Sequence, residues 1–165
     1  MRKIICFHNP DEVNGFLSNW YLSEFNMEQM KFSSMEQYMM YKKAQLFQDW
    51  EIAEKILSTN QVGNIKMLGR SVKNYEDIMW NGVRQIIVYE GLLAKFEQNQ
   101  TLLDKLLATG DAVLAECAVK DCIWGIGLSM KDERRFLVEE WKGQNLLGYT
   151  LMRVRDKLTE RIGCL

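Results

Sequence analysis

The sequence predicts an α+β fold that is predominantly helical, with a small β-sheet and a single domain over residues 1–165. The length fits one domain, because domains most often run about 100–150 residues. One proline and eleven glycines leave no stretch that resembles a linker between domains. From residue 33 onward the apolar spacing is helical, and strands and helices do not alternate as a doubly wound sheet requires.

Extended segments are predicted mainly near the N-terminus. Residues 3–7 form an apolar, β-type run that ends in a loop around Asn9-Pro10-Asp11. Residues 20–21 and 30–32 are predicted to be short strands that pair with this first one. Residues 113–118 are predicted to be extended as well. These segments are expected to supply the small sheet.

Helices are predicted over most of the remaining chain. The first covers residues 34–47, because Ser33-Ser34-Met35-Glu36 fits the S-x-x-E capping box of a helix start. The last covers residues 146–161, and one of its faces is formed by apolar side chains at helical spacing, namely Leu147, Leu151, Val154 and Leu158. The others are predicted over residues 51–57, 62–68 up to Gly69, 75–96, and 102–108 closed by Gly110.

The composition is typical of a globular protein and excludes two classes. The chain is 47% hydrophobic and 26% charged, and its formal net charge is −1. Binding to nucleic acid through bulk charge needs a basic surplus, which this balance lacks. No segment approaches the roughly 18 consecutive apolar residues of a membrane helix, and the initial apolar run is shorter than the about 7–15 residues of a signal peptide. A cytoplasmic location is therefore expected.

Cysteine and histidine usage limits the possible chemistry. The four cysteines (Cys6, Cys117, Cys122 and Cys164) form no CxxC pair, and His8 is the single histidine. A closed zinc site needs four ligands at tighter spacing, so we expect neither a metal nor a cofactor. The cysteines are expected to be small apolar residues that are buried or half-buried. Carboxylates and lysines are the expected catalytic groups.

Glu36 and Lys43 are candidate catalytic residues on the first predicted helix. Their spacing of seven residues places them about 20° apart around the helix axis and about 10 Å apart along it. A sugar-sized group fits between a carboxylate and an amine presented in this way. The alternative is that Glu36 only completes the capping box and that Lys43, beside Lys42, is a solvated surface lysine.

A glycine-rich turn is the second candidate. Asp121 precedes Trp124 by three residues, and Gly125 and Gly127 follow. Such a turn can present an indole face for base stacking next to a carboxylate. The alternative is an ordinary turn around a tryptophan of the core.

Two polar segments complete the set of candidates. Asn145 stands where the last helix begins, so it is either an N-cap or part of a phosphate site at the helix start. Asn19 and Trp20 lie in an aromatic, polar segment ahead of the first helix. This segment either lines a pocket or packs into the core.

The order of these motifs along the chain resembles the NADAR (YbiA-like) N-glycosidase family over about residues 4–158. The runs that carry the resemblance are Leu17-Ser18-Asn19-Trp20-Tyr21, Ser34-Met35-Glu36-Gln37-Tyr38 with Lys43, Leu68-Gly69-Arg70, Lys95-Phe96-Glu97-Gln98-Asn99, Leu107-Ala108-Thr109-Gly110-Asp111, Asp121 with Trp124-Gly125-Ile126-Gly127, and Gly143-Gln144-Asn145-Leu146-Leu147-Gly148.

The resemblance implies a YbiA-like fold and hydrolysis of a ribosyl C–N bond. It implies removal of ADP-ribose from guanine, in a nucleoside or nucleic acid, as the activity. The alternatives are hydrolysis of the ribosylamino-pyrimidine phosphates of riboflavin biosynthesis and binding of ADP-ribose or NAD without turnover. By the same resemblance Glu36 and Lys43 are catalytic. The substrate-binding residues it implies are Asn19, Trp20, Asp121, Trp124, Gly125 and Asn145.

The family chemistry suggests a mechanism and a genetic context. Cleavage of a ribosyl C–N bond passes through an oxocarbenium-like centre, which a carboxylate stabilises. We expect Lys43 to attack the ribose carbon and form an imine, with Glu36 as the proton-transfer partner. The alternative is direct attack by water with assistance from Glu36. The resemblance also implies pairing with a guanine ADP-ribosyltransferase toxin as one genetic context.

Overall fold

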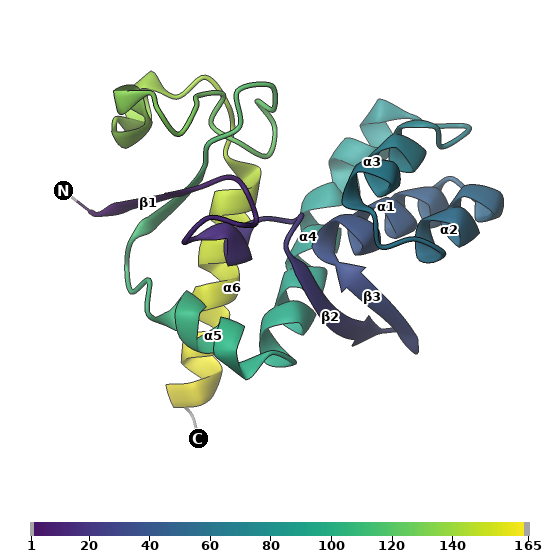
Figure 1. Ribbon diagram of the computed structural model, residues 1–165, viewed down its shortest axis with the longest axis horizontal. Helices are drawn as coiled ribbons and strands as arrows, with labels where there is room; N and C mark the ends of the chain where they lie inside the picture. The colour runs from purple at the N-terminus through teal and green to yellow at the C-terminus, as the bar shows by residue number, and fades with distance from the viewer. Residues whose placement is uncertain (1, 164–165) are drawn as a thin grey trace. The chain divides into compact units, whose positions relative to one another are not determined.

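The computed structural model describes residues 2–163, which form two compact units (Figure 1). The α1 unit is Leu22–Asn99, and the α6 unit combines Met1–Tyr21 with Gln100–Leu165. Within the described range, helices dominate and each unit holds a two-stranded sheet, which confirms the predicted α+β, mostly helical class. That residues 1–165 act as one domain stays a prediction.

The α1 unit contains a β-hairpin followed by four helices. Its elements are β2 (Leu22–Met27), β3 (Met30–Ser34), α1 (Met35–Leu46), α2 (Trp50–Leu57), α3 (Val62–Arg70) and α4 (Asp77–Glu97). β2 and β3 are antiparallel, and Glu28 and Gln29 between them have φ values of +52° and +65°. Two consecutive positive φ angles characterise the tight turn of a hairpin. Residues 30–32 pair with β2 in this hairpin, so their predicted pairing with residues 3–7 is wrong. Residues 20–21 precede β2 and are not part of a strand, which also differs from the prediction.

The start of α1 lies one residue later than the predicted capping box. Ser34 is the N-cap, and its Oγ accepts a hydrogen bond from the Gln37 backbone N–H at 3.1 Å. Gln37 Oε1 in turn accepts from the Ser33 N–H at 2.7 Å. Glu36 is therefore the second residue of the helix, and its side chain is not needed for the cap.

Two glycines let helices approach α1 closely. Gly69 lies within α3, where a Cβ atom would fall 1.9 Å from Met40 Sδ. The prediction that Gly69 ends this helix is wrong, because α3 continues to Arg70 and the glycine serves packing instead. At Gly91 in α4, a Cβ atom would lie 2.5 Å from the ring of Tyr38, which is buried in an aromatic cluster with Phe25 and Phe32.

The α6 unit is built around one parallel strand pair and the last helix. Its elements are β1 (Ile4–Phe7), the 3-10 helix η1 (Gly15–Leu17), α5 (Gln100–Leu107), β4 (Val113–Glu116), the 3-10 helices η2 (Glu133–Phe136) and η3 (Val138–Glu140), and α6 (Leu146–Gly163). β1 runs parallel to β4, with Ile4 opposite Val113. The extended segments predicted over residues 3–7 and 113–118 are confirmed as β1 and β4. So is the apolar face of the last helix, whose members Leu147, Leu151, Val154 and Leu158 are all buried.

The cysteines only partly follow the prediction. Cys6 and Cys117 are buried in an apolar cluster with Ala115, Ile126 and Leu128, as expected of small apolar residues. Cys122 is exposed, which differs from the prediction. Cys164 lies outside the described residues.

The turn after α5 contains a glycine with a positive φ and is bonded to an arginine of α6. Gly110 has a φ of +58° in the turn after α5, which is the conformation predicted for a glycine that closes a helix. In α6, Arg155 Nη1 donates to Thr109 Oγ1 at 2.8 Å and to the Ala112 carbonyl at 2.9 Å, which ties the helix to this turn.

Across residues 2–163, each helix is too short or too polar to cross a lipid bilayer.

The close contact at Gly91 gives a test of the α1–α4 packing. Gly91→Ala is expected to lower the free energy of unfolding by about 1–3 kcal/mol, because the new methyl group overlaps the Tyr38 ring. Gly82→Ala in the same helix is the control, since no atom lies within 4 Å of its Cβ position. This control should gain about 0.5–1 kcal/mol from helix propensity. Urea denaturation measures both, and equal stability of the two variants would contradict the packing.

Candidate active site

The two predicted catalytic residues lie on α1 and differ in their exposure. Glu36 is in the first turn and is only 4% exposed. Lys43 is two turns further along and half-buried. Their charges interact, because the Glu36 carboxylate raises the pKa of Lys43 against a larger lowering by burial. The structure therefore presents a buried carboxylate and a partly accessible amine on one helix.

The Lys43 amine is surrounded by groups from α3, from α4 and from the segment between them. Nζ donates a hydrogen bond to the Gly69 carbonyl of α3 at 2.8 Å. It also lies 4.2 Å from the centre of the Tyr75 ring and 6.0 Å from the Trp80 ring. Lys42, the next residue, forms an ion pair with the exposed Glu28 at 3.0 Å. Lys43 is thus not a solvated surface lysine, and that alternative is wrong.

The protonation of Lys43 is set by burial and by three neighbouring charges. Burial lowers the pKa of the amine, because the ammonium loses hydration. The Arg70 guanidinium lowers this pKa further, whereas the Asp77 and Glu36 carboxylates raise it. The net direction is downward, so the neutral, nucleophilic form of Lys43 is more populated near neutral pH than for an ordinary lysine.

The glycine-rich turn in the α6 unit is shaped by Asp121. Its Oδ1 accepts hydrogen bonds from the backbone N–H groups of Ile123 at 2.9 Å and of Trp124 at 2.8 Å. Trp124 is half-buried. A Cβ atom on Gly125 would lie 2.8 Å from the Glu116 carbonyl, so only glycine lets the turn lie against the end of β4. The carboxylate thus fixes the turn that presents the Trp124 indole.

Asn145 supports this turn rather than capping α6 with its side chain. The residue is fully buried and has a φ of +52°. Its Oδ1 accepts from the Glu116 N–H at 3.1 Å, and its Nδ2 donates to the Leu114 carbonyl at 2.8 Å. Its backbone N–H donates to the Gly125 carbonyl at 3.1 Å. Asn145 does take the predicted N-cap position, because its carbonyl accepts the first helical bond from the Tyr149 N–H at 3.1 Å, but its side chain bonds to β4 and not to the helix start. A role of Asn145 toward substrate stays a prediction.

Asn19 and Trp20 follow η1 in the α6 unit. Asn19 is 5% exposed, and within residues 2–163 its Oδ1 has no hydrogen-bond partner. Trp20 is 37% exposed, and its backbone N–H donates to Ser18 Oγ at 3.2 Å. A buried amide oxygen without a partner is costly unless something else satisfies it, which is compatible with the predicted binding role.

Several residues around Lys43 were not among the predicted site residues. Gly69 and Arg70 belong to a run that carries the family resemblance, so their order in the chain was a usable signal. Tyr75 and Asp77 had no such signal, because they meet Lys43 only through the packing of α3 and α4 on α1.

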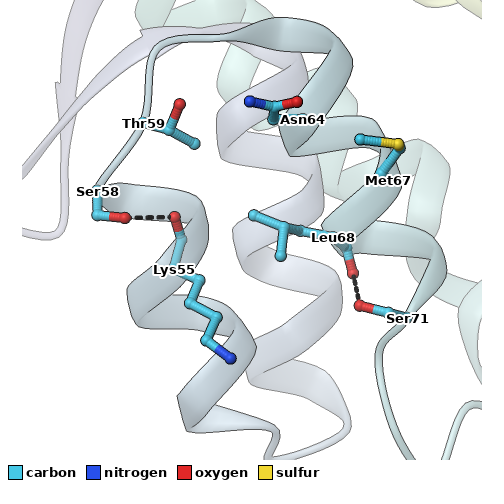
Figure 2. A pocket seen from close by; sticks show the side chains of 7 residues that line it. All are labelled: Lys55, Ser58, Thr59, Asn64, Met67, Leu68 and Ser71. Carbon is cyan, nitrogen blue, oxygen red and sulfur yellow. Dashed lines mark hydrogen bonds between the residues drawn. The ribbon is translucent and has the colours of Figure 1, made fainter.

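The α1 unit also contains an open groove that is separate from these residues (Figure 2). It has a volume of about 550 Å³ and is lined by Lys55, Ser58, Thr59, Asn64, Met67, Leu68 and Ser71. The hydroxyls of Ser58 and Ser71 donate to the carbonyls of Lys55 and Leu68 on their own helices, at 2.8 Å each. None of the predicted site residues lines this groove.

Throughout residues 2–163, His, Cys, Asp and Glu side chains form no cluster of three that could hold a metal ion.

Comparison with known proteins supports the resemblance noted in the sequence. The family model described as NADAR domain matches residues 6–159. An N-glycosidase of Acanthamoeba polyphaga mimivirus is 36% identical over 163 residues, covering 94% of this chain and 96% of that protein. A riboflavin biosynthesis protein of Vibrio vulnificus is 33% identical over 160 residues, which are 97% of this chain but 40% of that protein.

A solved structure agrees with these matches. The NMR structure of the Escherichia coli protein YbiA superposes with a TM-score of 0.80 at 29% identity, over 97% of this chain and 87% of that one. The chain therefore belongs to the NADAR domain family, and it is an enzyme that hydrolyses N-glycosyl bonds.

Proposed function

We propose that this enzyme removes ADP-ribose from guanine by cleaving the bond between the ribose C1′ and a guanine nitrogen, with Lys43 as nucleophile and Glu36 as proton-transfer group. The observation that carries the proposal is the arrangement on α1. A 4% exposed carboxylate shares the helix with a half-buried amine whose pKa burial lowers. Binding of a ligand alone would not require such a pair.

The first step replaces the base by the lysine. The neutral Lys43 amine attacks C1′, a C1′–Nζ bond forms, and the bond from C1′ to the guanine nitrogen breaks. The proton that the amine loses passes through Glu36 to the departing guanine nitrogen. Positive charge at C1′ develops during this step, and a nearby carboxylate stabilises it.

The second step opens the sugar and releases the product. The ring oxygen takes up the remaining Nζ proton as C1′ and Nζ form an imine. Water then adds to C1′, the C1′–Nζ bond breaks, and the amine regains its two protons. The balance is one water consumed, with guanine and ADP-ribose released.

Two guanidinium groups near Lys43 support a phosphate-bearing substrate. The positive charge of Arg70 lowers the pKa of the Lys43 amine, and that of Arg84 opposes the rise in the pKa of the Tyr75 hydroxyl. Guanidinium groups bind phosphate oxygens well, because their donors match the geometry. These features support a nucleotide-like substrate, and we propose that the enzyme acts on it in the cytoplasm.

A second candidate substrate is a ribosylamino-pyrimidine phosphate of riboflavin biosynthesis. The observation in its favour is the 33% identity to the riboflavin biosynthesis protein of Vibrio vulnificus. Because this chain spans 40% of that protein, the name describes a longer chain. Binding of ADP-ribose or NAD without turnover disagrees with the kinship to N-glycosidases. A genetic pairing with a guanine ADP-ribosyltransferase toxin is compatible with the first candidate only.

Incubation with each substrate class separates these candidates. The purified protein is mixed with ADP-ribosylated guanosine and, separately, with a ribosylamino-pyrimidine phosphate, and products are identified by mass. Release of free guanosine with ADP-ribose supports the proposal. Cleavage of only the pyrimidine substrate would assign the second function and would contradict the proposal.

Glu36→Gln is expected to reduce kcat by about 10²–10⁴-fold, because a positioned acid–base group contributes that much and an amide transfers no proton. The fold should persist, since Ser34 and Gln37 rather than Glu36 form the helix cap. Steady-state kinetics and thermal unfolding on the same sample give both quantities. Glu54→Gln, at an exposed position of α2, is the control. A Glu36→Gln variant with more than about a tenth of the wild-type rate would remove Glu36 from the mechanism.

Borohydride added during turnover is expected to reduce the imine and leave a stable adduct on Lys43. Peptide mapping by mass spectrometry locates the adduct. Lys43→Arg should carry none, because a guanidinium stays protonated and is a poor nucleophile. Lys42 is an internal control, since it points about 100° away around the helix and pairs with Glu28. An adduct on Lys42, or an active Lys43→Arg variant, speaks against the imine route and for direct attack by water.

A further inference from the structure

Tyr75 contacts the Lys43 amine although it is not one of the predicted site residues. It lies in the segment between α3 and α4, and its ring centre is 4.2 Å from Nζ. The side chain is 39% exposed, so part of it remains at the surface beside the amine.

The position of the Tyr75 ring is fixed at several points. Its hydroxyl donates a hydrogen bond to Asp77 Oδ1 at 2.8 Å. The ring packs edge-on against Phe47, with 5.3 Å between the ring centres and 64° between their planes. The segment before it is anchored as well, because the Lys73 backbone N–H donates to Asp49 Oδ2 at 2.9 Å. The ring is therefore a built part of the Lys43 surroundings.

The contacts of Nζ determine where its lone pair points. A neutral amine has two N–H bonds and one lone pair in a roughly tetrahedral arrangement around nitrogen. One N–H is directed at the Gly69 carbonyl, 2.8 Å away. The face of the Tyr75 ring is electron-rich and its centre lies 4.2 Å from Nζ, so we take it as the acceptor of the second N–H. With both hydrogens engaged, the lone pair takes the remaining direction, away from both partners.

We propose that Tyr75 is a positioning residue that orients the Lys43 lone pair for attack on the ribose carbon. This inference rests on the proposed function, in which Lys43 is the nucleophile. Without the ring, Nζ keeps the Gly69 contact but rotates about its terminal bond, and productive orientations become rarer. The edge-on contact with Phe47 does not involve the hydroxyl, so it holds the plane of a phenylalanine ring at position 75 as well.

The charge of Asp77 can be separated from its structural contact. The charged groups that act on Lys43 are Asp77 of α4, Arg70 of α3 and Glu36 of α1. Asp77→Asn keeps an oxygen acceptor for the Tyr75 hydroxyl but removes a charge that raises the pKa of Lys43. Lys43 then stays neutral to lower pH. The acidic limb of the rate profile should move to lower pH, while the rate on the plateau stays the same.

The test measures the rate of borohydride-trapped adduct formation on Lys43 at saturating ADP-ribosylated guanosine. Tyr75→Leu removes the ring, and it is expected to slow trapping by about 10–100-fold with little change in KM, the size of effect typical of a misplaced reacting group. Tyr75→Phe keeps the ring and should stay within about threefold of the wild-type rate, which is clearly less than that loss. Rates are expressed per mole of folded protein. Should Tyr75→Leu not fold, Tyr75→Gln, which suits an exposed segment, replaces it.

Three results would overturn the inference while leaving the proposed function intact. They are wild-type trapping by Tyr75→Leu, equal loss in Tyr75→Phe and Tyr75→Leu, and a raised KM with an unchanged saturating rate. The last would make Tyr75 a substrate-binding residue. Absence of any adduct on a wild-type enzyme that cleaves the substrate would overturn the imine route itself, and this inference with it.

Discussion

The buried side-chain amide of Gln37 is the constraint on which the α1 unit depends. Its Oε1 accepts from the Ser33 N–H at 2.7 Å and from Ser33 Oγ at 3.1 Å. Its Nε2 donates to the carbonyls of Ile56 at 3.0 Å and Thr59 at 2.9 Å. One amide thus joins the end of β3, the start of α1 and the end of α2. Because these contacts fix α1 along and around its axis, they also set the positions of Glu36 and Lys43.

This constraint combines with packing to give Lys43 unusual surroundings. Gly69 brings α3 against α1, which places the carbonyl of that glycine within 2.8 Å of Nζ. The start of α4 supplies Asp77, and Tyr75 precedes it. Burial lowers the pKa of the amine, whereas two carboxylates limit the shift. The chemistry proposed for this enzyme needs that combination, because an amine must lose its proton near neutral pH and still be reached by a substrate.

The sequence predicted the helices well and the pairing of strands poorly, for physical reasons. Helical periodicity is local, so the α1 and α6 segments were found within a few residues. The partner of β1 is β4, more than a hundred residues later, and no local pattern encodes that pairing. At the start of α1, both Ser33 with Glu36 and Ser34 with Gln37 fit a capping box. Contacts of Gln37 with the end of α2 decide between them, and these exist only in the folded chain.

The site was predicted in the same uneven way. Order along the chain singled out Glu36, Lys43 and the glycine-rich turn, but not what surrounds them. Asn145 looked like a helix cap, whereas its left-handed backbone directs the side chain to β4. Tyr75 carried no signal, because its contact with Lys43 arises from how α4 is packed. Residue types and spacing thus indicate candidate groups, and packing determines their protonation and direction.

The protonation of Lys43 is the quantity that tests this account most directly. Protein labelled with ¹³C at the lysine Cε positions is titrated by NMR, and the Lys43 resonance is assigned from its absence in Lys43→Arg. Lys55 is the reference, because its ion pair with Glu51 raises its pKa. We predict that Lys43 titrates at clearly lower pH than Lys55, since burial disfavours its ammonium form. Titration of Lys43 together with Lys55, or at higher pH, would contradict the account.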